Sequence, residues 1–248
     1  EGVYVRQGYS SVPATDAAIR LMIKETDGDH FEAMRSLNQN LTFYATTEEF
    51  QLRNVEFGPQ QMRSLKLIDS DGLYTNLALL LSDQCVHSIK AAVFQGKDQT
   101  IFKDRREFSG SLMKQMHEVY DFIDFRNQTR ATVEKLLRVD VRDYPEIAIR
   151  EALLNLLVHR SIPSAPVRSS AFTKTGSSCI YWRLMPEIEL EDILAGISIC
   201  RNPDLANIFY RLQLIEAYGT GISKIMKAYE GTNTRPRIET TKNTFKII

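Results

Sequence analysis

The sequence predicts an α+β fold, in which a mainly helical first half precedes a region of mixed strands and helices. Three observations support this prediction. Apolar residues recur at helical spacing in the first half, and polarity alternates at 88–96 and again at 129–143. An almost wholly apolar helix then follows at 144–160. The 248 residues suffice for one large or two small domains.

The first half is expected to contain several short helices. Apolar spacing predicts helices at 16–26 and 30–37. Thr46 and Thr47 predict a capped helix start from about residue 47, with Glu49 near the third helical position. Pro59 opens a further helix, and a turn at 69–72 precedes the segment 73–83.

Residues 41–96 are compatible with a winged-helix-like arrangement, because two short helices and a turn precede an extended arm. The helix that would read bases carries the polar residues Gln60, Gln61, Arg63 and Lys66. A small helical packing module with an ordinary polar face explains the same pattern. Both interpretations stay open.

The second half is expected to alternate strands with long helices. Residues 88–96 read as a strand, and the charged residues 103–108 as an edge strand or loop. Ser109 is expected to cap a helix that runs to about Phe125. The alternating segment 129–143 leads, through Tyr144 and Pro145, into the apolar helix.

That apolar helix carries one polar stripe. Glu151, Asn155 and His159 are spaced four residues apart and therefore lie on one face, and Arg160 follows directly. A carboxylate, a carboxamide and an imidazole in a row suit a water molecule, a hydrated Mg²⁺ ion and a phosphate oxygen, respectively. A plain solvated stripe is the alternative interpretation.

Composition narrows the class of protein. Thirty-one basic and 31 acidic residues give no net charge, so the chain as a whole lacks a basic footprint for nucleic acid. Three distant cysteines indicate neither a disulfide framework nor a zinc site. No apolar run reaches the roughly 18 to 20 residues that span a bilayer, so we expect a cytoplasmic protein without a membrane segment.

The stripe has the pattern E-x-x-x-N-x-x-x-H-R, which resembles the N-box of the GHKL ATP-binding superfamily in its branch of helicase-related transcriptional regulators. Val3–Thr15 looks like the last strand of the Schlafen, AlbA-type DNA-binding domain that precedes this module in the family. Arg201–Glu230 looks like the family's closing helix, glycine turn and final helix. Because the chain begins without Met, inside an apparent strand, we expect that an upstream domain is missing.

The resemblance implies three parts. They are a remnant of the AlbA-type domain at 1–14, a helical linker region at 15–96, and a GHKL-like α/β sandwich at 97–248. It implies ATP and Mg²⁺ as cofactors, DNA as a partner through the missing domain, and self-association. Glu151 would be the general base and Asn155 the Mg²⁺ ligand. The nucleotide would contact His159, Arg160, Arg201, Asn202, Gly219, Thr220 and Gly221.

Residues 161–184 depart from the family pattern, since they hold six serines, the only Trp and no acidic residue. The codons that encode 170–175, read one base out of frame, permit the string S-V-Y-E-D-R that the resemblance requires. We therefore hypothesise that this block is frame-shifted, and that family-like sequence resumes at Met185. Loss of the native strand pair would disrupt the sheet of the sandwich. A genuine serine-rich insertion is the alternative.

The sequence leaves several functions open. The chain is expected to be the ATP-binding regulatory part of a DNA-binding transcriptional regulator. One alternative is an ATP-hydrolysing enzyme that acts with nucleic acid, and another is a defective fragment that binds no nucleotide. No G-x-x-x-x-G-K-[ST] loop is present, so we do not expect a helicase motor.

Overall fold

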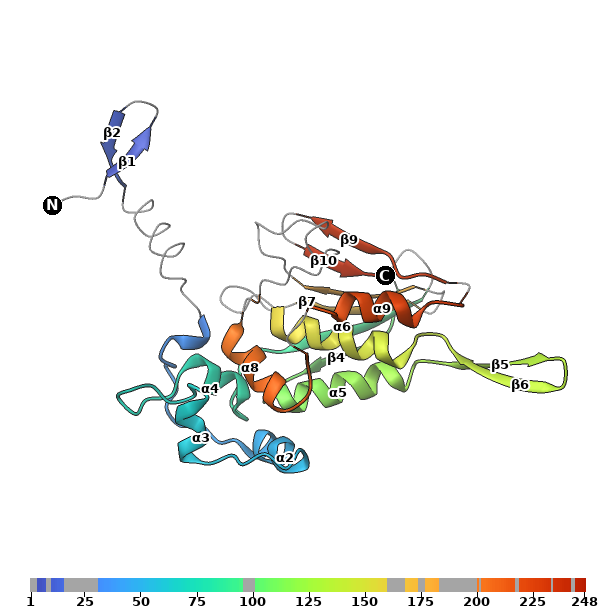
Figure 1. Cartoon of the computed structure of the whole chain (residues 1–248), viewed down its shortest axis with the longest axis horizontal. Coiled ribbons are helices and arrows are strands. Elements are labelled where there is room, and N and C mark those ends of the chain that lie inside the picture. Colours follow the sequence, from blue (N-terminus) through green and yellow to red (C-terminus); the bar gives the residue numbers. More distant parts are fainter. Residues whose placement is uncertain are drawn as a thin grey trace.

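The structure, a computed structural model, is built on one six-stranded mixed sheet (Figure 1). It describes residues 4–7, 10–15, 31–95, 101–159, 168–173, 177–182, 200, 202–216, 219–232, 234–241 and 244–248. The strand order is β4-β3-β7-β8-β10-β9. The strands are β3 (Ile89–Gln95), β4 (Ile101–Phe108), β7 (Arg168–Thr173), β8 (Ser177–Trp182), β9 (Ile238–Thr241) and β10 (Thr244–Ile247). Among them β3 and β7 run parallel, and the other neighbouring pairs are antiparallel.

Three helices pack together over this sheet: α5 (Leu112–Asp124), α6 (Glu146–His159) and α9 (Gly221–Ala228) (Figure 1). Helix α6 contacts α5 on one side, α9 on the other and β8 below. Nine of its residues are buried, which confirms the prediction of a helix packed on several sides. Its buried apolar side chains belong to one continuous core that reaches from Phe43 to Ile247. The mixed helix and strand content fits the predicted α+β class.

The expectation that the block 161–184 disrupts the sheet is wrong for the strands that the structure describes. Strands β7 and β8 form an antiparallel pair with Ala171 opposite Cys179. This pair lies in the middle of the sheet, between β3 and β10. The run Cys179–Trp182 combines β-branched and aromatic residues, which favour strands. The expectation rested on the loss of the family's strand pair, whereas the residues now present form a strand pair of their own.

The middle region consists of η1 (Phe31–Ala33), α2 (Tyr44–Leu52), α3 (Pro59–Ser64) and α4 (Asn76–Leu81). It packs into the same core as the sheet and its helices. Buried Glu32 accepts hydrogen bonds from the backbone N–H groups of Asp204 and Leu205, at 2.8 and 3.0 Å. It thereby caps α8 (Pro203–Arg211) from a distant part of the chain. The segment 31–33 is thus fixed to the carboxy-terminal half.

Two helix starts differ from the predicted ones. Helix α2 begins at Tyr44, before the expected cap, because the Asp83 carboxylate accepts from the N–H groups of Tyr44 and Ala45. Thr46 donates instead to the Leu81 carbonyl oxygen at 2.5 Å. Helix α5 is capped by Ser111 rather than by Ser109, since its hydroxyl accepts from Met113 N–H.

Three helices end in the same way, with a residue other than glycine in the left-handed region. Asn54 after α2, Lys66 after α3 and Gln213 after α8 have φ values of 56°, 61° and 56°. In each case the next N–H group bonds back to the last turn, as in a Schellman motif. Lys66 follows the end of α3 at Ser64 and therefore does not lie on that helix. Its ammonium group donates to Asp204 at 2.7 Å and so already has an acidic partner. The winged-helix interpretation stays a prediction.

Two hairpins complete the described chain. Residues 3–15, expected to hold one strand, contain two short antiparallel strands, β1 (Tyr4–Gln7) and β2 (Ser10–Pro13). The hairpin of β5 (Thr129–Glu134) and β6 (Leu137–Arg142) projects from the body (Figure 1). The helix predicted at 16–26 lies outside the described residues. No helix in the described part of the chain is long and apolar enough to cross a bilayer.

Candidate functional site

The predicted polar stripe lies on the middle and the end of α6. Pro145 immediately precedes the helix, and its carbonyl oxygen accepts the N–H groups of Ala148 and Ile149. Glu151 is 9% exposed, whereas Asn155 and His159 are half-buried. The three side chains follow one another along a single face, as their spacing predicts.

The glycine motif lies against this stripe. Gly221 is the first residue of α9, and a Cβ atom on it would lie 3.0 Å from Nδ2 of Asn155 and 3.2 Å from Oε2 of Glu151. Contacts this short leave no ordinary room for a larger residue. Glycine at position 221 therefore allows the start of α9 to approach Glu151 and Asn155 closely. The N–H groups of that first turn have no partner within the helix itself, and they carry a partial positive charge beside the stripe.

Glu151 is anchored by its neighbour in the sequence. Arg150 Nη1 donates to Oε1 of Glu151 at 2.5 Å, and Arg150 Nη2 donates to the carbonyl oxygen of Leu214 at 2.5 Å. Leu214 belongs to the turn that follows α8. One guanidinium thus holds the carboxylate of the stripe in place and fixes α6 to that turn.

The turn before α9 has a backbone that favours glycine. Gly219 has a φ of +65°, in the left-handed region. Thr220 precedes the helix without capping it, and its hydroxyl donates to Oε2 of Glu216 at 3.0 Å. Lys224, one turn into α9, pairs with Oε1 of Glu216 at 2.5 Å. Hydrogen bonds from Lys224 and Thr220 lower the pKa of the Glu216 carboxyl below its ordinary value.

Asn202 is brought to the end of the stripe helix. It is 3% exposed, and its Nδ2 donates to the carbonyl oxygen of Val158 at 2.7 Å. This bond satisfies one of the last carbonyl groups of α6, next to His159. Arg160 and Arg201, which the resemblance also assigns to the site, lie outside the described residues. The structure therefore groups Glu151, Asn155 and Gly221, with Asn202 at the carboxyl end of the same helix.

A cavity of about 500 Å³ is lined by Arg150, the partner of Glu151, and by Lys224 of α9. Arg150, Arg211 and Lys224 bring positive charge to it, and Glu216 brings one negative charge. The remaining lining residues are Tyr210, Gln213, Leu214 and Ile215. Sequence reasoning did not select Arg150 or Lys224. Both residues could have been chosen from the sequence, because Arg150 adjoins Glu151 and Lys224 lies one helical turn after Gly221.

The oxygen atoms of Glu151 and Asn155 are of the kind that Mg²⁺ prefers. Within the described ranges, no group of three or more His, Cys, Asp or Glu side chains is placed to hold a metal ion. A cation held by Glu151 and Asn155 would take one or two ligands from the protein and the rest from water and phosphate. These two side chains do not form an all-protein cage.

Comparison with known proteins agrees with an ATPase-like assignment. A family model described as "Putative ATP-dependent DNA helicase recG C-terminal" matches residues 183–248. No curated protein matches the chain. A crystal structure of the DIP2311 protein from Corynebacterium diphtheriae superimposes with a TM-score of 0.72 at 18% identity, over 100% of this chain and 53% of that chain.

At that identity the likeness to the Corynebacterium protein shows the fold alone, and the present chain spans about half its length. The family match begins at residue 183, beyond the helix that carries the stripe. It includes Asn202 and the glycine motif at 219–221. The carboxy-terminal part of the chain, residues 183–248, is therefore similar to a helicase-related, ATPase-like domain.

Proposed function

We propose that the chain is the ATP-binding regulatory part of a DNA-binding transcriptional regulator. The observation that carries the proposal is the contact of Gly221 with Glu151 and Asn155. It joins the two predicted nucleotide elements, which are 66 residues apart when counted from Asn155 to Gly221. A helix start beside a carboxylate and a carboxamide offers both anion-binding N–H groups and oxygen ligands.

Each residue then has a definite role. Asn155, through Oδ1, would hold Mg²⁺, which when bound neutralises charge on the phosphates. Glu151 would accept a proton from a water molecule, and Arg150 holds its carboxylate in position for that role. Gly219 and Gly221 let the backbone N–H groups of the turn approach a phosphate. His159, Arg160 and Arg201 would orient the phosphates, and Asn202 would fix the end of α6.

Contact with DNA is assigned to a domain upstream of the β1–β2 hairpin. Equal numbers of basic and acidic residues make this chain itself a poor electrostatic partner for a duplex. The description of the matching family names a DNA helicase, which supports a nucleic-acid context for the whole protein. Self-association is part of the same proposal.

The test is nucleotide binding by the full chain, measured as a thermal stability shift with ATP and Mg²⁺. A double variant, Glu151→Gln with Asn155→Ala, should lose the shift. Glu146→Gln is the matched control, because Glu146 is an exposed carboxylate in the first turn of the same helix. Ligand at 100 times its Kd stabilises a folded protein by about 2.7 kcal/mol, which a thermal shift detects readily.

Measurement of ATP hydrolysis distinguishes a nucleotide sensor from an ATP-hydrolysing enzyme. A shift without phosphate release supports a nucleotide sensor, whereas release that disappears in Glu151→Gln supports an ATP-hydrolysing enzyme. Absence of any shift in the original chain, at nucleotide concentrations up to the millimolar range, would refute nucleotide binding and leave the defective fragment.

A further inference from the structure

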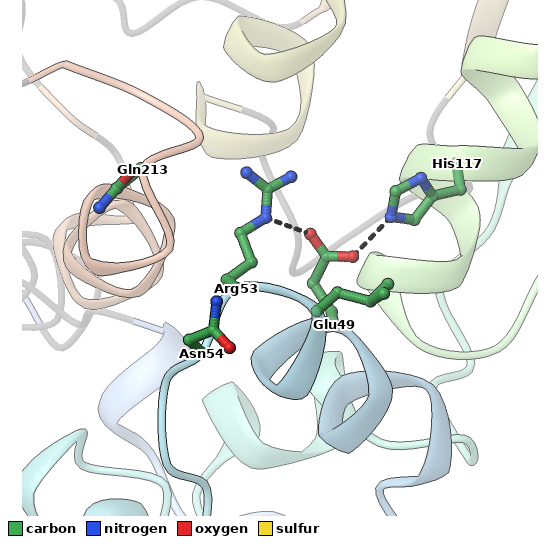
Figure 2. A pocket seen from close by; sticks show the side chains of 6 residues that line it. Glu49, Arg53, Asn54, His117 and Gln213 are labelled. Carbon is green, nitrogen blue, oxygen red and sulfur yellow. Dashed lines mark hydrogen bonds and ion pairs between the residues drawn. The ribbon is translucent and has the colours of Figure 1, made fainter.

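A second polar cavity, which shares Gln213 with the first, lies where α2, α5 and the turn after α8 meet (Figure 2). Its volume is about 370 Å³, within the range of roughly 300 to 1,000 Å³ that small-molecule sites occupy. The lining residues come from these three separate parts of the chain. They are Glu49, Leu52, Arg53, Asn54, His117 and Gln213.

Glu49 is the buried residue that contacts both Arg53 and His117 of this cavity. Its side chain is 3% exposed, and each of its oxygens is used. Oε1 accepts from Nε of Arg53 at 2.9 Å, and Oε2 lies 2.6 Å from Nε2 of His117 (Figure 2). Burial raises the pKa of the Glu49 carboxyl, but the bonds from His117 and Arg53 outweigh burial and hold it below its ordinary value. The carboxylate is therefore a fixed anion that orients the guanidinium of Arg53 and the imidazole of His117.

The outer edges of these two side chains remain open to the cavity. Arg53 is 33% exposed and His117 is 54% exposed. The terminal nitrogens of the Arg53 guanidinium point away from Glu49 (Figure 2). In the described part of the chain, Arg53 forms its hydrogen bond and ion pair with Glu49 through the Nε atom. Its two Nη groups present a planar pair of donors to the cavity.

Two carboxamides complete the cavity. Asn54 and Gln213 each end a helix in the left-handed region, where glycine is the least costly residue. Both nevertheless carry polar side chains that line the cavity (Figure 2). They add amide donors on the side of the cavity away from His117.

We propose that this cavity binds a small organic acid through its carboxylate group. Arg53 would bind the two carboxylate oxygens with its Nη groups, which is the planar geometry that a guanidinium favours. Even with the imidazole protonated, Arg53, His117 and Glu49 carry one net positive charge together. That charge matches a monoanion rather than a phosphate dianion. This site does not depend on the proposed nucleotide function.

The test uses the full chain and the side-chain ¹H–¹⁵N NMR signals of Arg53 and His117. Acetate, inorganic phosphate and chloride are titrated separately at constant ionic strength. We expect acetate to shift both signals saturably, and chloride to leave them unchanged. Arg53→Gln should weaken acetate binding by about tenfold or more, because it removes a charge-assisted bidentate contact. Arg63→Gln, an exposed arginine on α3 outside the cavity, is the matched control.

Gln213→Gly provides a second variant that preserves the fold, because glycine suits its backbone. It should weaken acetate binding by a few fold and leave the chain at least as stable. Shifts that grow linearly with acetate, or that are unchanged in both Arg53→Gln and Gln213→Gly, would refute the site. Stronger binding of phosphate than of acetate would refute the assignment to a carboxylate. A nucleotide-induced stability shift that persists in Arg53→Gln would show that the two sites are separate.

Discussion

Gly221→Ala tests the contact on which the nucleotide proposal depends. Alanine gains up to about 1 kcal/mol over glycine in a helix, and less at the first position. Against this gain, the new methyl group would lie 3.0 Å from Nδ2 of Asn155 and 3.2 Å from Oε2 of Glu151. Overpacking of this kind costs about 1–3 kcal/mol. Because Arg150 holds Glu151 in place, we expect Asn155 to move and the net loss to be about 1 kcal/mol.

The assay is urea unfolding of the original chain and the variant, together with ATP titration. Gly58→Ala is the matched control, since Gly58 also lies at a helix start and its added Cβ would meet only the flexible end of Gln61, at 3.2 Å. This control should cost about 0.5 kcal/mol. In an Asn155→Ala background, the cost of Gly221→Ala should fall by at least half. An equal cost in both backgrounds, or a gain in stability from Gly221→Ala alone, would refute the close contact.

Three further predictions follow from other contacts. Glu49→Gln should lower the free energy of unfolding by about 1–3 kcal/mol at neutral pH. The pKa of Glu49 in the folded protein is lowered from 4.5, so the stability difference between the two proteins should persist above pH 4.5 and shrink below it. Chemical unfolding at several pH values measures this difference. Asn202→Ala should cost about 1–3 kcal/mol in thermal unfolding, since it removes a donor from the buried end of α6, and a loss near zero would contradict that role. Sequencing of the gene across codons 161–184 should reveal lost bases relative to an intact reading frame, whereas an undisturbed frame would leave the serine-rich block as a genuine insertion.

The elements that the sequence predicted well are those with strong local patterns. The apolar pattern and Pro145 predicted both the start of α6 and its burial on several sides. Four-residue spacing likewise placed Glu151 and Asn155 on one face. The family resemblance placed a glycine turn between two helices, and Gly221 is the first residue of α9. Local chemistry was sufficient for α6, whereas the glycine turn was placed by the resemblance.

Features that depend on distant partners could not be predicted. The start of α2 depends on Asp83, which lies 39 residues from Tyr44. The carboxylate of Glu49 appeared to belong to a helix cap, whereas His117, 68 residues away, draws it into a separate cavity. Arg150 was passed over because its contact with Leu214 spans 64 residues. The two partners of each contact are too far apart in the sequence for a local pattern to include both.

The cap that Glu32 provides to α8 sets a limit on the order in which the chain can fold. Glu32 and Asp204 are separated by 172 residues, so their contact closes a very long loop. During synthesis from the amino terminus, Glu32 must wait until Asp204 and Leu205 have been made before these bonds can form. Contacts of such long range also slow folding in solution. The Glu32 carboxylate, made early, is therefore among the last groups of the middle region to reach its final bonded state.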